Sequence, residues 1–361
     1  MPWFRRRSPR DPAPETTAAR MRSALQQVLA GDLAAAERIL AEAARVDSSS
    51  SDLYLALAIV YRARGEIERA NRIHQNLLLR QDLDEGLRRE ALLGLALDFR
   101  AGGFLARASA SFEELLEIEP HNLHALRELE NLRVEARDWE GAVRARLRIG
   151  SRDPQTARVL AHLWTGWGRG YAEAGREDEA RRAFRHGLSQ DRGCADAFIA
   201  LGDQQMRAER PERAIAYYRR TLGLHPAIGG LVFPKLWEAC EKAGDLGTLE
   251  ALLRERLKAE REDRTAVGWL ARLLVSSGRS DEALVLLRRL ARSAADPLAA
   301  RAEIARAQLR DSRRDEALES LETLLDHIPR DLPRLQCQAC GIRTPELHWR
   351  CPQCGAWDSI V

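Results

Sequence analysis

The sequence predicts an all-α protein, in which a solenoid of stacked helical hairpins is followed by a small metal-binding module. Two observations lead to this prediction. A turn residue and a small residue recur at a period of about 34 positions, and the chain ends with two Cys-x-x-Cys-Gly units that are separated by ten residues. The composition agrees, because 45% of the 361 residues are hydrophobic and 31% are charged, as in a folded soluble protein.

The repeating pattern pairs a turn residue with a small or apolar residue five positions later. Successive pairs are 34, 35 or 38 residues apart. A period of 34 is that of the tetratricopeptide repeat (TPR), in which each repeat is one helical hairpin. The pairs are Gly31/Ala36, Gly65/Ala70, Gly103/Ala108, Arg137/Ala142, Gly175/Ala180, Glu209/Ala214, Gly244/Leu249, Gly278/Ala283 and Ser312/Ala317.

Stacked hairpins bury the apolar faces that a single hairpin would expose, and the stack winds into a superhelix. We therefore predict a TPR superhelical solenoid over residues 17–331. The two helices of a repeat cross closely at the position twelve residues before the small residue, so this position also requires a small side chain. Glu130 and Trp237 occupy it in the fourth and seventh repeats and are too large, so these two repeats should be distorted. The nine repeats are expected near residues 17–50, 51–84, 89–122, 123–156, 161–194, 195–228, 230–263, 264–297 and 298–331.

The first helices of the hairpins should line a concave groove that binds peptides or protein helices. By repeat register, the side chains of Arg62, Arg169, Asp203 and Arg207 should face this groove. No phosphate-binding loop, H-E-x-x-H motif or G-x-S-x-G elbow occurs in the sequence, so we expect a protein that is not an enzyme. The net charge of +3 disfavours a nucleic-acid partner.

Residues 1–16 form a basic leader that we expect to be disordered, because they contain four prolines and four arginines. Its Trp-Phe-Arg-Arg-Arg stretch at residues 3–7 is able to touch an anionic membrane surface, but a solvated tail is the preferred interpretation. No apolar run in the sequence is long enough for a membrane span.

The C-terminal module, residues 333–361, contains the candidate metal ligands Cys337, Cys340, Cys351 and Cys354. Two facing Cys-x-x-Cys turns supply four thiolates in a tetrahedron, which suits one Zn²⁺ or one iron ion. Four protein ligands leave no position for water, which favours a structural site. His348 is a weaker candidate ligand, while Trp349 and Trp357 should either pack over the sulfurs or shield a partner-binding face.

The remaining cysteines, Cys194 and Cys240, fit small apolar positions and are interpreted as packing thiols. This cysteine usage is typical of a reducing cytoplasm. The short separation of the two knuckles would leave iron poorly shielded, so zinc is preferred to iron.

Two stretches resemble one bacterial family. Residues 64–78, which include Arg-Ile-His-Gln at 72–75, and the tail formed by residues 335–341 and 347–357 are similar to the second repeat and the rubredoxin-like module of the lipopolysaccharide assembly protein B (LapB) family. The resemblance extends over residues 17–361. It implies an adaptor that links the membrane protease FtsH to turnover of the deacetylase LpxC and thereby regulates lipopolysaccharide and lipid A synthesis, with the four cysteines as metal ligands.

The resemblance also implies a location at the cytoplasmic face of the inner membrane. That family has a membrane helix before a short basic segment, and residues 3–7 look like the basic segment alone. Either the true start lies upstream or the chain is soluble and recruited to the membrane by its partners.

Three alternatives to the adaptor remain at this point. The first is a generic TPR scaffold or co-chaperone in which the metal module is a structural cap. The second is an electron carrier of the rubredoxin type, and the third is a nucleic-acid-binding zinc ribbon. The short loop between the knuckles disfavours the second, and the few basic residues around them disfavour the third.

Overall fold

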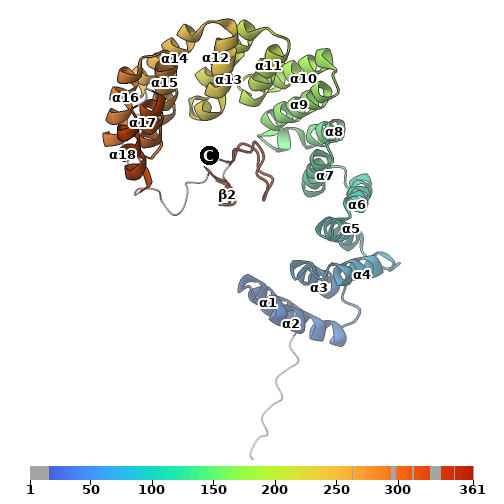
Figure 1. The fold of residues 1–361 in the computed structure, drawn as a ribbon. Coiled ribbons are helices and arrows are strands. Elements are labelled where there is room, and N and C mark those ends of the chain that lie inside the picture. The colour runs from blue at the N-terminus through green and yellow to red at the C-terminus, as the bar shows by residue number, and fades with distance from the viewer. Residues whose placement is uncertain are drawn as a thin grey trace, which may run out of the picture. The chain divides into compact units, whose positions relative to one another are not determined.

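The computed structural model describes residues 16–261, 263–293, 298–310, 313–325, 335–344 and 346–360. Its chain divides into two compact units, residues 1–156 and 157–361 (Figure 1). The predicted leader lies outside the described residues, except for Thr16, whose hydroxyl caps the first helix by accepting a hydrogen bond from the backbone N–H of Ala19 at 3.2 Å.

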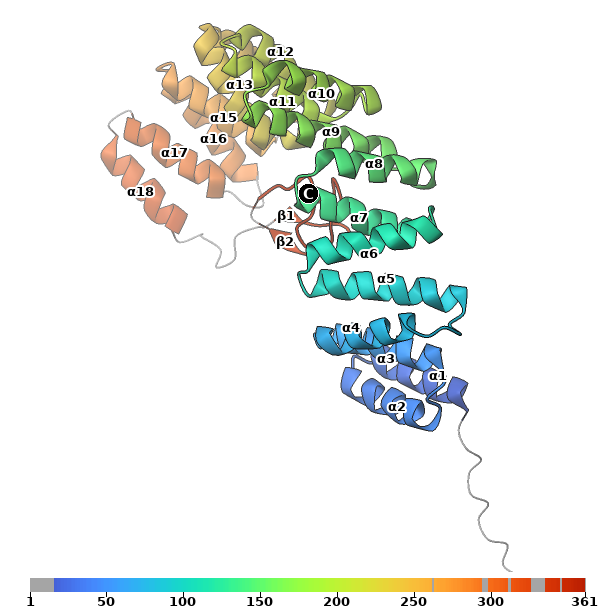
Figure 2. The same ribbon diagram turned by 90° about the vertical axis from the view of Figure 1, so that its right-hand side faces the viewer.

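Unit 1 consists of helical hairpins that follow one another in chain order, as Figure 2 shows. Its elements are α1 (Thr17–Leu29), α2 (Leu33–Val46), α3 (Ser51–Ala63), α4 (Ile67–Leu78), α5 (Glu85–Ala101), α6 (Leu105–Ile118), α7 (Leu123–Glu135), α8 (Trp139–Ile149) and the 3₁₀ turn η1 (Gly150–Arg152).

Unit 2 continues the same hairpin pattern and ends in a small β module. Its helices are α9 (Thr156–Glu173), α10 (Glu177–Gln190), α11 (Ala195–Arg207), α12 (Pro211–Leu224), η2 (Pro226–Ile228), α13 (Gly229–Ala243), α14 (Leu246–Ala259), α15 (Arg264–Ser276), α16 (Ser280–Ser293), α17 (Leu298–Arg310) and α18 (Arg314–Leu325). The module contains the two short strands β1 (Leu335–Gln336) and β2 (Arg343–Thr344). These elements confirm the predicted all-α fold with a small C-terminal module.

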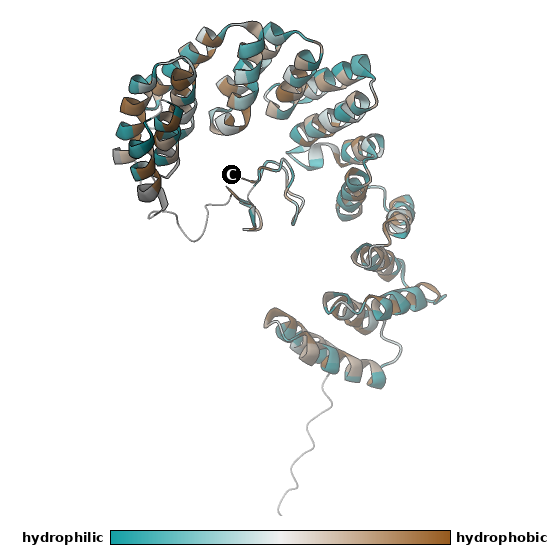
Figure 3. Ribbon diagram, viewed as in Figure 1, coloured by the Kyte–Doolittle hydropathy of each residue, from teal (hydrophilic) through white to brown (hydrophobic). Residues whose placement is uncertain are grey.

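Each helix has hydrophobic and hydrophilic residues side by side along its length, as Figure 3 shows. The hydrophobic residues meet between neighbouring helices, and the largest buried cluster, which includes Phe233, Leu236 and Leu270, extends through unit 2 from α11 to α17. Among the helices that the structure describes, none has the length and hydropathy of a membrane span.

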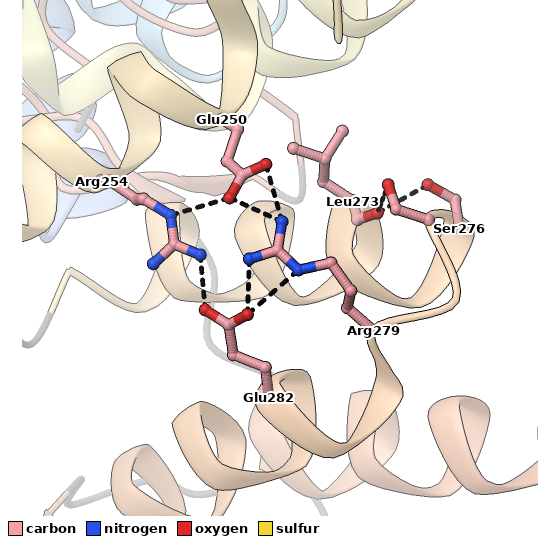
Figure 4. Close-up of polar contacts among 7 residues, drawn as sticks. Glu250, Arg254, Leu273, Ser276, Arg279 and Glu282 are labelled. Carbon is pink, nitrogen blue, oxygen red and sulfur yellow. Dashed lines mark hydrogen bonds and ion pairs between the residues drawn. The ribbon is translucent and has the colours of Figure 1, made fainter. Parts of the chain in front are cut away.

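Charged side chains connect neighbouring hairpins at the surface. In unit 2, Glu250 and Arg254 of α14 meet Arg279 and Glu282 at the start of α16, the second helix of the next hairpin (Figure 4). Arg279 Nη1 lies 3.0 Å from both carboxylate oxygens of Glu250. Exposed pairs of this kind contribute about 0–1 kcal/mol each, so they order the surface more than they stabilise the fold.

The turn between the two helices of a hairpin requires a left-handed backbone. Six of these turns place Gly at φ between 68° and 80°, as Gly175 does at 74°. Arg137 and Glu209 occupy the equivalent turns with φ of 56° and 55°. A residue with a Cβ atom costs about 1–2 kcal/mol in this conformation, so these two turns are strained.

Glu209→Gly should therefore increase the free energy of unfolding by up to about 1 kcal/mol, since relief of the strain exceeds the backbone entropy of glycine. Gly175→Ala is the matched control, and it should destabilise by about 1 kcal/mol. Urea unfolding followed by circular dichroism measures both. A Glu209→Gly variant that is less stable than the wild type would show that this turn is not strained.

The fourth repeat accommodates its oversized residue with a buried ion pair. Glu130 of α7 is 2% exposed, and its two carboxylate oxygens accept hydrogen bonds from Nε and Nη2 of Arg146 on α8 at 2.6 and 2.9 Å. Arg146 Nη1 also donates to Asp153 at 2.9 Å. Because the pair neutralises the charge, α7 continues without interruption through this position.

Arg146→Met should lower the free energy of unfolding by about 3–5 kcal/mol, because it leaves the Glu130 carboxylate buried without its guanidinium partner. The control is Arg144→Met on the same helix, where the arginine side chain is exposed, and the change should stay within about 0.5 kcal/mol. Equal effects of the two substitutions in urea unfolding would contradict this explanation of Glu130.

Candidate metal centre

The C-terminal module is a pair of knuckles held together by short backbone pairings. Strands β1 and β2 are antiparallel, with Leu335 opposite Thr344. The N–H of Gly341 donates to the carbonyl of Cys337 at 2.8 Å, and the N–H of Gly355 donates to the carbonyl of Cys351 at 3.0 Å. These bonds close the two Cys-x-x-Cys turns and direct the cysteine side chains toward one point.

The four candidate ligand sulfurs form one compact group. The Sγ atoms of Cys337, Cys340, Cys351 and Cys354 all lie within 4.8 Å of one another. The Cys337–Cys354 and Cys340–Cys351 distances are both 3.7 Å. A disulfide requires about 2.05 Å, whereas a tetrahedron with metal–sulfur bonds of about 2.3 Å has an edge of about 3.8 Å. The sulfurs therefore fit a tetrahedral metal ion with four thiolate ligands.

The surroundings of the sulfurs divide them into two pairs: hydrogen bonds lower the pKa of Cys337 and Cys351, whereas burial and contacts with the other thiols raise the pKa of Cys340 and Cys354. The Ser359 hydroxyl lies 3.2 Å from Cys337 Sγ, and its hydrogen bond lowers the pKa of Cys337 to about 6. Cys337 and Cys351 are buried, while Cys340 and Cys354 are exposed. Among the described residues, these four cysteines form the candidate metal-binding group, and every member of it is a Cys. His348 does not belong to this group.

The module has little hydrophobic core of its own, and its aromatic residues pack onto the helices of unit 2. The buried hydrophobic cluster of the module consists of Cys337, Cys351 and Ile360, with three partly buried aliphatic side chains against them. The ring of Trp357 stacks on His162 of α9 with centroids 5.2 Å apart, and Trp349 lies 5.8 Å from the same imidazole. Trp349 also packs against the large core cluster of unit 2.

His162 joins the module to α9 and α11 through two carboxylates. Its Nε2 lies 3.0 Å from Asp358 of the module, and its Nδ1 lies 3.3 Å from Asp196 of α11. Asp196 is 2% exposed and also accepts hydrogen bonds from Arg169. No local pattern in the sequence predicts this contact, because a buried histidine in a helix looks like any other helical residue.

The two carboxylates keep His162 charged. Burial by itself lowers the pKa of His162, but hydrogen bonds and charge interactions with Asp196 and Asp358 outweigh it and raise the pKa to about 9. The same contacts, with Arg169 as the strongest favourable charge, hold the pKa of Asp196 below its usual value in spite of complete burial. A protonated imidazole donates to both carboxylates, so at neutral pH it bridges the module and the helices.

The predicted groove residues fall into two groups. Arg169, Asp203 and Arg207 line one hollow of about 320 Å³ between α9, α10 and α11. Arg62 belongs to unit 1, where it donates to the buried carboxylate of Asp98 at 2.8 Å. In the same unit, His74 of the Arg-Ile-His-Gln segment lies 2.6 Å from Asp98, which gives that segment a structural role.

Each of the three predicted residues in the hollow also has an intramolecular partner. Asp203 accepts from Lys235 at 2.9 and 3.0 Å and from the Tyr218 hydroxyl at 2.7 Å. Arg207 donates to Glu177 at 3.0 Å. Their role in binding a partner stays a prediction. The predicted packing thiols, Cys194 and Cys240, are both buried.

Comparison with known proteins identifies relatives for both parts of the chain. Residues 336–361 match the family model of the rubredoxin metal binding domain, and residues 165–227 match that of the tetratricopeptide repeat. Lipopolysaccharide assembly protein B of Escherichia coli (strain K12) is 25% identical over 319 residues, which cover 87% of this chain and 81% of that protein. The protein of the same name from Haemophilus influenzae is 24% identical over 314 residues, or 86% and 79% of the two chains.

Two of the similar solved structures align over about half of the chain. The crystal structure of MamA covers 47% of this chain and 95% of its own, with 19% identity and a TM-score of 0.34. YrrB, described as a TPR protein with an unusual peptide-binding site, covers 52% and 93%, with 21% identity and a TM-score of 0.35. The relatives and family models together confirm the resemblance to the LapB family and the rubredoxin-like character of the module.

Cys354→Ser should abolish metal binding and loosen residues 335–360, because three thiolates and a hydroxyl no longer complete the site. The helical signal should survive, because the helices keep their own hydrophobic cores when the metal is lost. Metal content by mass spectrometry and far-ultraviolet circular dichroism measure the two effects, with Gln353→Ser in the same knuckle as the control. A large loss of helical signal would mean that the helices depend on the module.

The docking of the module onto α9 should become less stable as the pH rises. The pKa of His162 is raised from 6.5 to about 9 on folding, so its contribution is fully present below pH 6.5 and is lost as the pH rises through about 9. The maximum contribution is on the order of 3 kcal/mol. His162→Gln should remove this pH dependence between pH 6 and 10, whereas the exposed His121→Gln should retain it. Unfolding curves that change with pH equally in both variants would contradict this role of His162.

Proposed function

We propose that this protein is a non-enzymatic adaptor in lipopolysaccharide assembly, which binds partner proteins on one surface formed by TPR helices and the metal module. One observation supports this most directly. Asp358, His162, Asp196 and Arg169 form a continuous chain of polar contacts from the module to the hollow that contains Asp203 and Arg207. A partner that contacts the module is therefore close to the predicted groove.

The partners that we propose are the membrane protease FtsH and the deacetylase LpxC, with the adaptor at the cytoplasmic face of the inner membrane. The names of the curated relatives, lipopolysaccharide assembly protein B, support this pathway. In this proposal the adaptor presents LpxC for turnover and thus limits lipid A synthesis. A site with four thiolate ligands supplies no open coordination position, so the metal has a structural role, and we propose one zinc ion, with one iron ion as the alternative.

The alternative is a TPR scaffold or co-chaperone in which the module is only a cap. A cap on a solenoid covers the exposed face of a terminal repeat. Here the polar and aromatic contacts of the module with His162 involve α9, at the beginning of unit 2, instead of its last helix. This arrangement favours a binding surface over a cap.

The test is an affinity pull-down from membranes of the native organism with three baits: wild type, Cys351→Ser/Cys354→Ser, and the control Gln338→Ser/Gln353→Ser. Both glutamines are exposed in the same knuckles and supply no sulfur. We expect FtsH or LpxC with the wild type and the control but not with the cysteine variant. Equal recovery of unrelated proteins with all three baits would favour the scaffold and contradict the lipid A role.

A further inference from the structure

A second hollow in unit 2 contains none of the predicted groove residues. It has a volume of about 850 Å³ and lies between α13, α15 and α17. We call it the tryptophan groove, because Trp237 and Trp269 line it with ring centroids 6.1 Å apart. Its other lining residues include Arg272, Glu303, Arg306, Leu309 and Arg310.

The repeat register places this groove on the same helix face as the predicted one. Arg272 and Arg306 directly follow the small residues Ala271 and Ala305, as Arg169 and Asp203 follow Gly168 and Gly202. Arg310 comes five positions after its small residue, as Arg207 does. Equivalent positions of successive repeats lie side by side in a stack of hairpins. The tryptophan groove is therefore built from the positions that the register assigns to partner binding.

The charge of the groove is positive. Three arginines surround one carboxylate, Glu303, whose Oε1 accepts from Arg272 Nε at 3.0 Å and from Arg306 Nη1 at 2.6 Å. The side chain of Glu303 is 11% exposed, whereas that of Arg306 is 64% exposed. Glu303 therefore pairs with Arg272 and Arg306 from the buried side of the groove. The exposed N–H donors of Arg306 and Arg310 remain accessible to a ligand.

The groove also has an apolar part. The guanidinium of Arg272 lies 4.7 Å from the ring centroid of Trp269, which fixes the orientation of that indole. Both tryptophans are only partly buried, and Leu309 is half exposed. Accessible aromatic and arginine side chains in one hollow are typical of the centre of a protein-binding site.

We propose that the tryptophan groove binds an extended acidic peptide segment of a partner protein. A bulky apolar side chain of the segment packs against Trp237, Trp269 and Leu309, and flanking carboxylates pair with Arg306 and Arg310. Charge complementarity selects an acidic segment, because carboxylates form bidentate pairs with guanidinium groups. This inference rests on the proposed adaptor function and adds to it the location of one binding site and the chemistry of its partner.

The test uses fluorescence anisotropy with the full-length protein and a labelled twelve-residue peptide, in which Phe-Leu is flanked on each side by Asp and Glu. A second peptide has Lys in place of each acid. The groove variant is Arg306→Glu/Arg310→Glu. The control variant, Lys258→Glu/Arg261→Glu, makes the same change of charge at exposed residues outside the groove. Circular dichroism verifies that both variants keep their helices.

We expect saturable binding of the acidic peptide to the wild type, at least tenfold weaker binding to the groove variant, and a change of less than twofold in the control variant. Leu309→Ser should weaken binding severalfold and leave its salt dependence unchanged. The inference is overturned if the wild type does not bind the acidic peptide, if both charge variants lose affinity equally, or if the lysine peptide binds as well. Binding of anionic phosphatidylglycerol vesicles in place of the peptide would also overturn it.

The pull-down described above separates this inference from the adaptor function. Suppose that the groove variant and the wild type recover FtsH or LpxC in equal amounts and bind the peptide with equal affinity. The groove inference then fails and the adaptor function stands. If the wild type recovers neither protein but the groove variant alone loses the peptide, the adaptor assignment fails and the groove remains a peptide site.

Discussion

The arrangement of unit 2 depends on a buried carboxylate, Asp196, and the imidazolium that it holds. Asp196 is stabilised by Arg169 and in turn orients His162, whose second nitrogen faces Asp358 of the module. The module has too small a core to be stable alone, so a metal ion and this contact must supply most of its stability. Metal binding, docking and the shape of the neighbouring hollow are therefore coupled.

A similar group of three residues in unit 1 shows what distinguishes His162, the histidine that contacts the module. His74 and Arg62 share the buried carboxylate of Asp98, as His162 and Arg169 share Asp196. A Cβ atom on Gly94 would lie 2.3 Å from His74 Nε2, so the next helix closes that side of the ring. In unit 2 the corresponding nitrogen reaches the module. The three residues of unit 1 therefore stabilise a stack of helices, whereas those of unit 2 additionally bind the C-terminal module.

Local and periodic features could be read from the sequence, whereas contacts between distant residues could not. The period of the turn residues predicted the hairpins because each repeat packs only against its neighbours. The cysteine spacing predicted the sulfur cluster because each knuckle is a local turn. His162 and Asp358 are 196 positions apart, and no local pattern marks either one. Arg272, Arg306 and Arg310 could have been found by extending the register of Arg169 and Arg207 to the last repeats.

We infer that a metal ion at the four sulfurs holds the module against α9. Hydrogen exchange of the full-length chain, followed by mass spectrometry with and without bound metal, tests it most directly. Metal removal should speed exchange in residues 335–360 and in the peptides of α9 and α11 that contain His162 and Asp196, and exchange in α1–α6 should not change. Unchanged protection of α9 and α11 after the metal is removed would contradict the coupling.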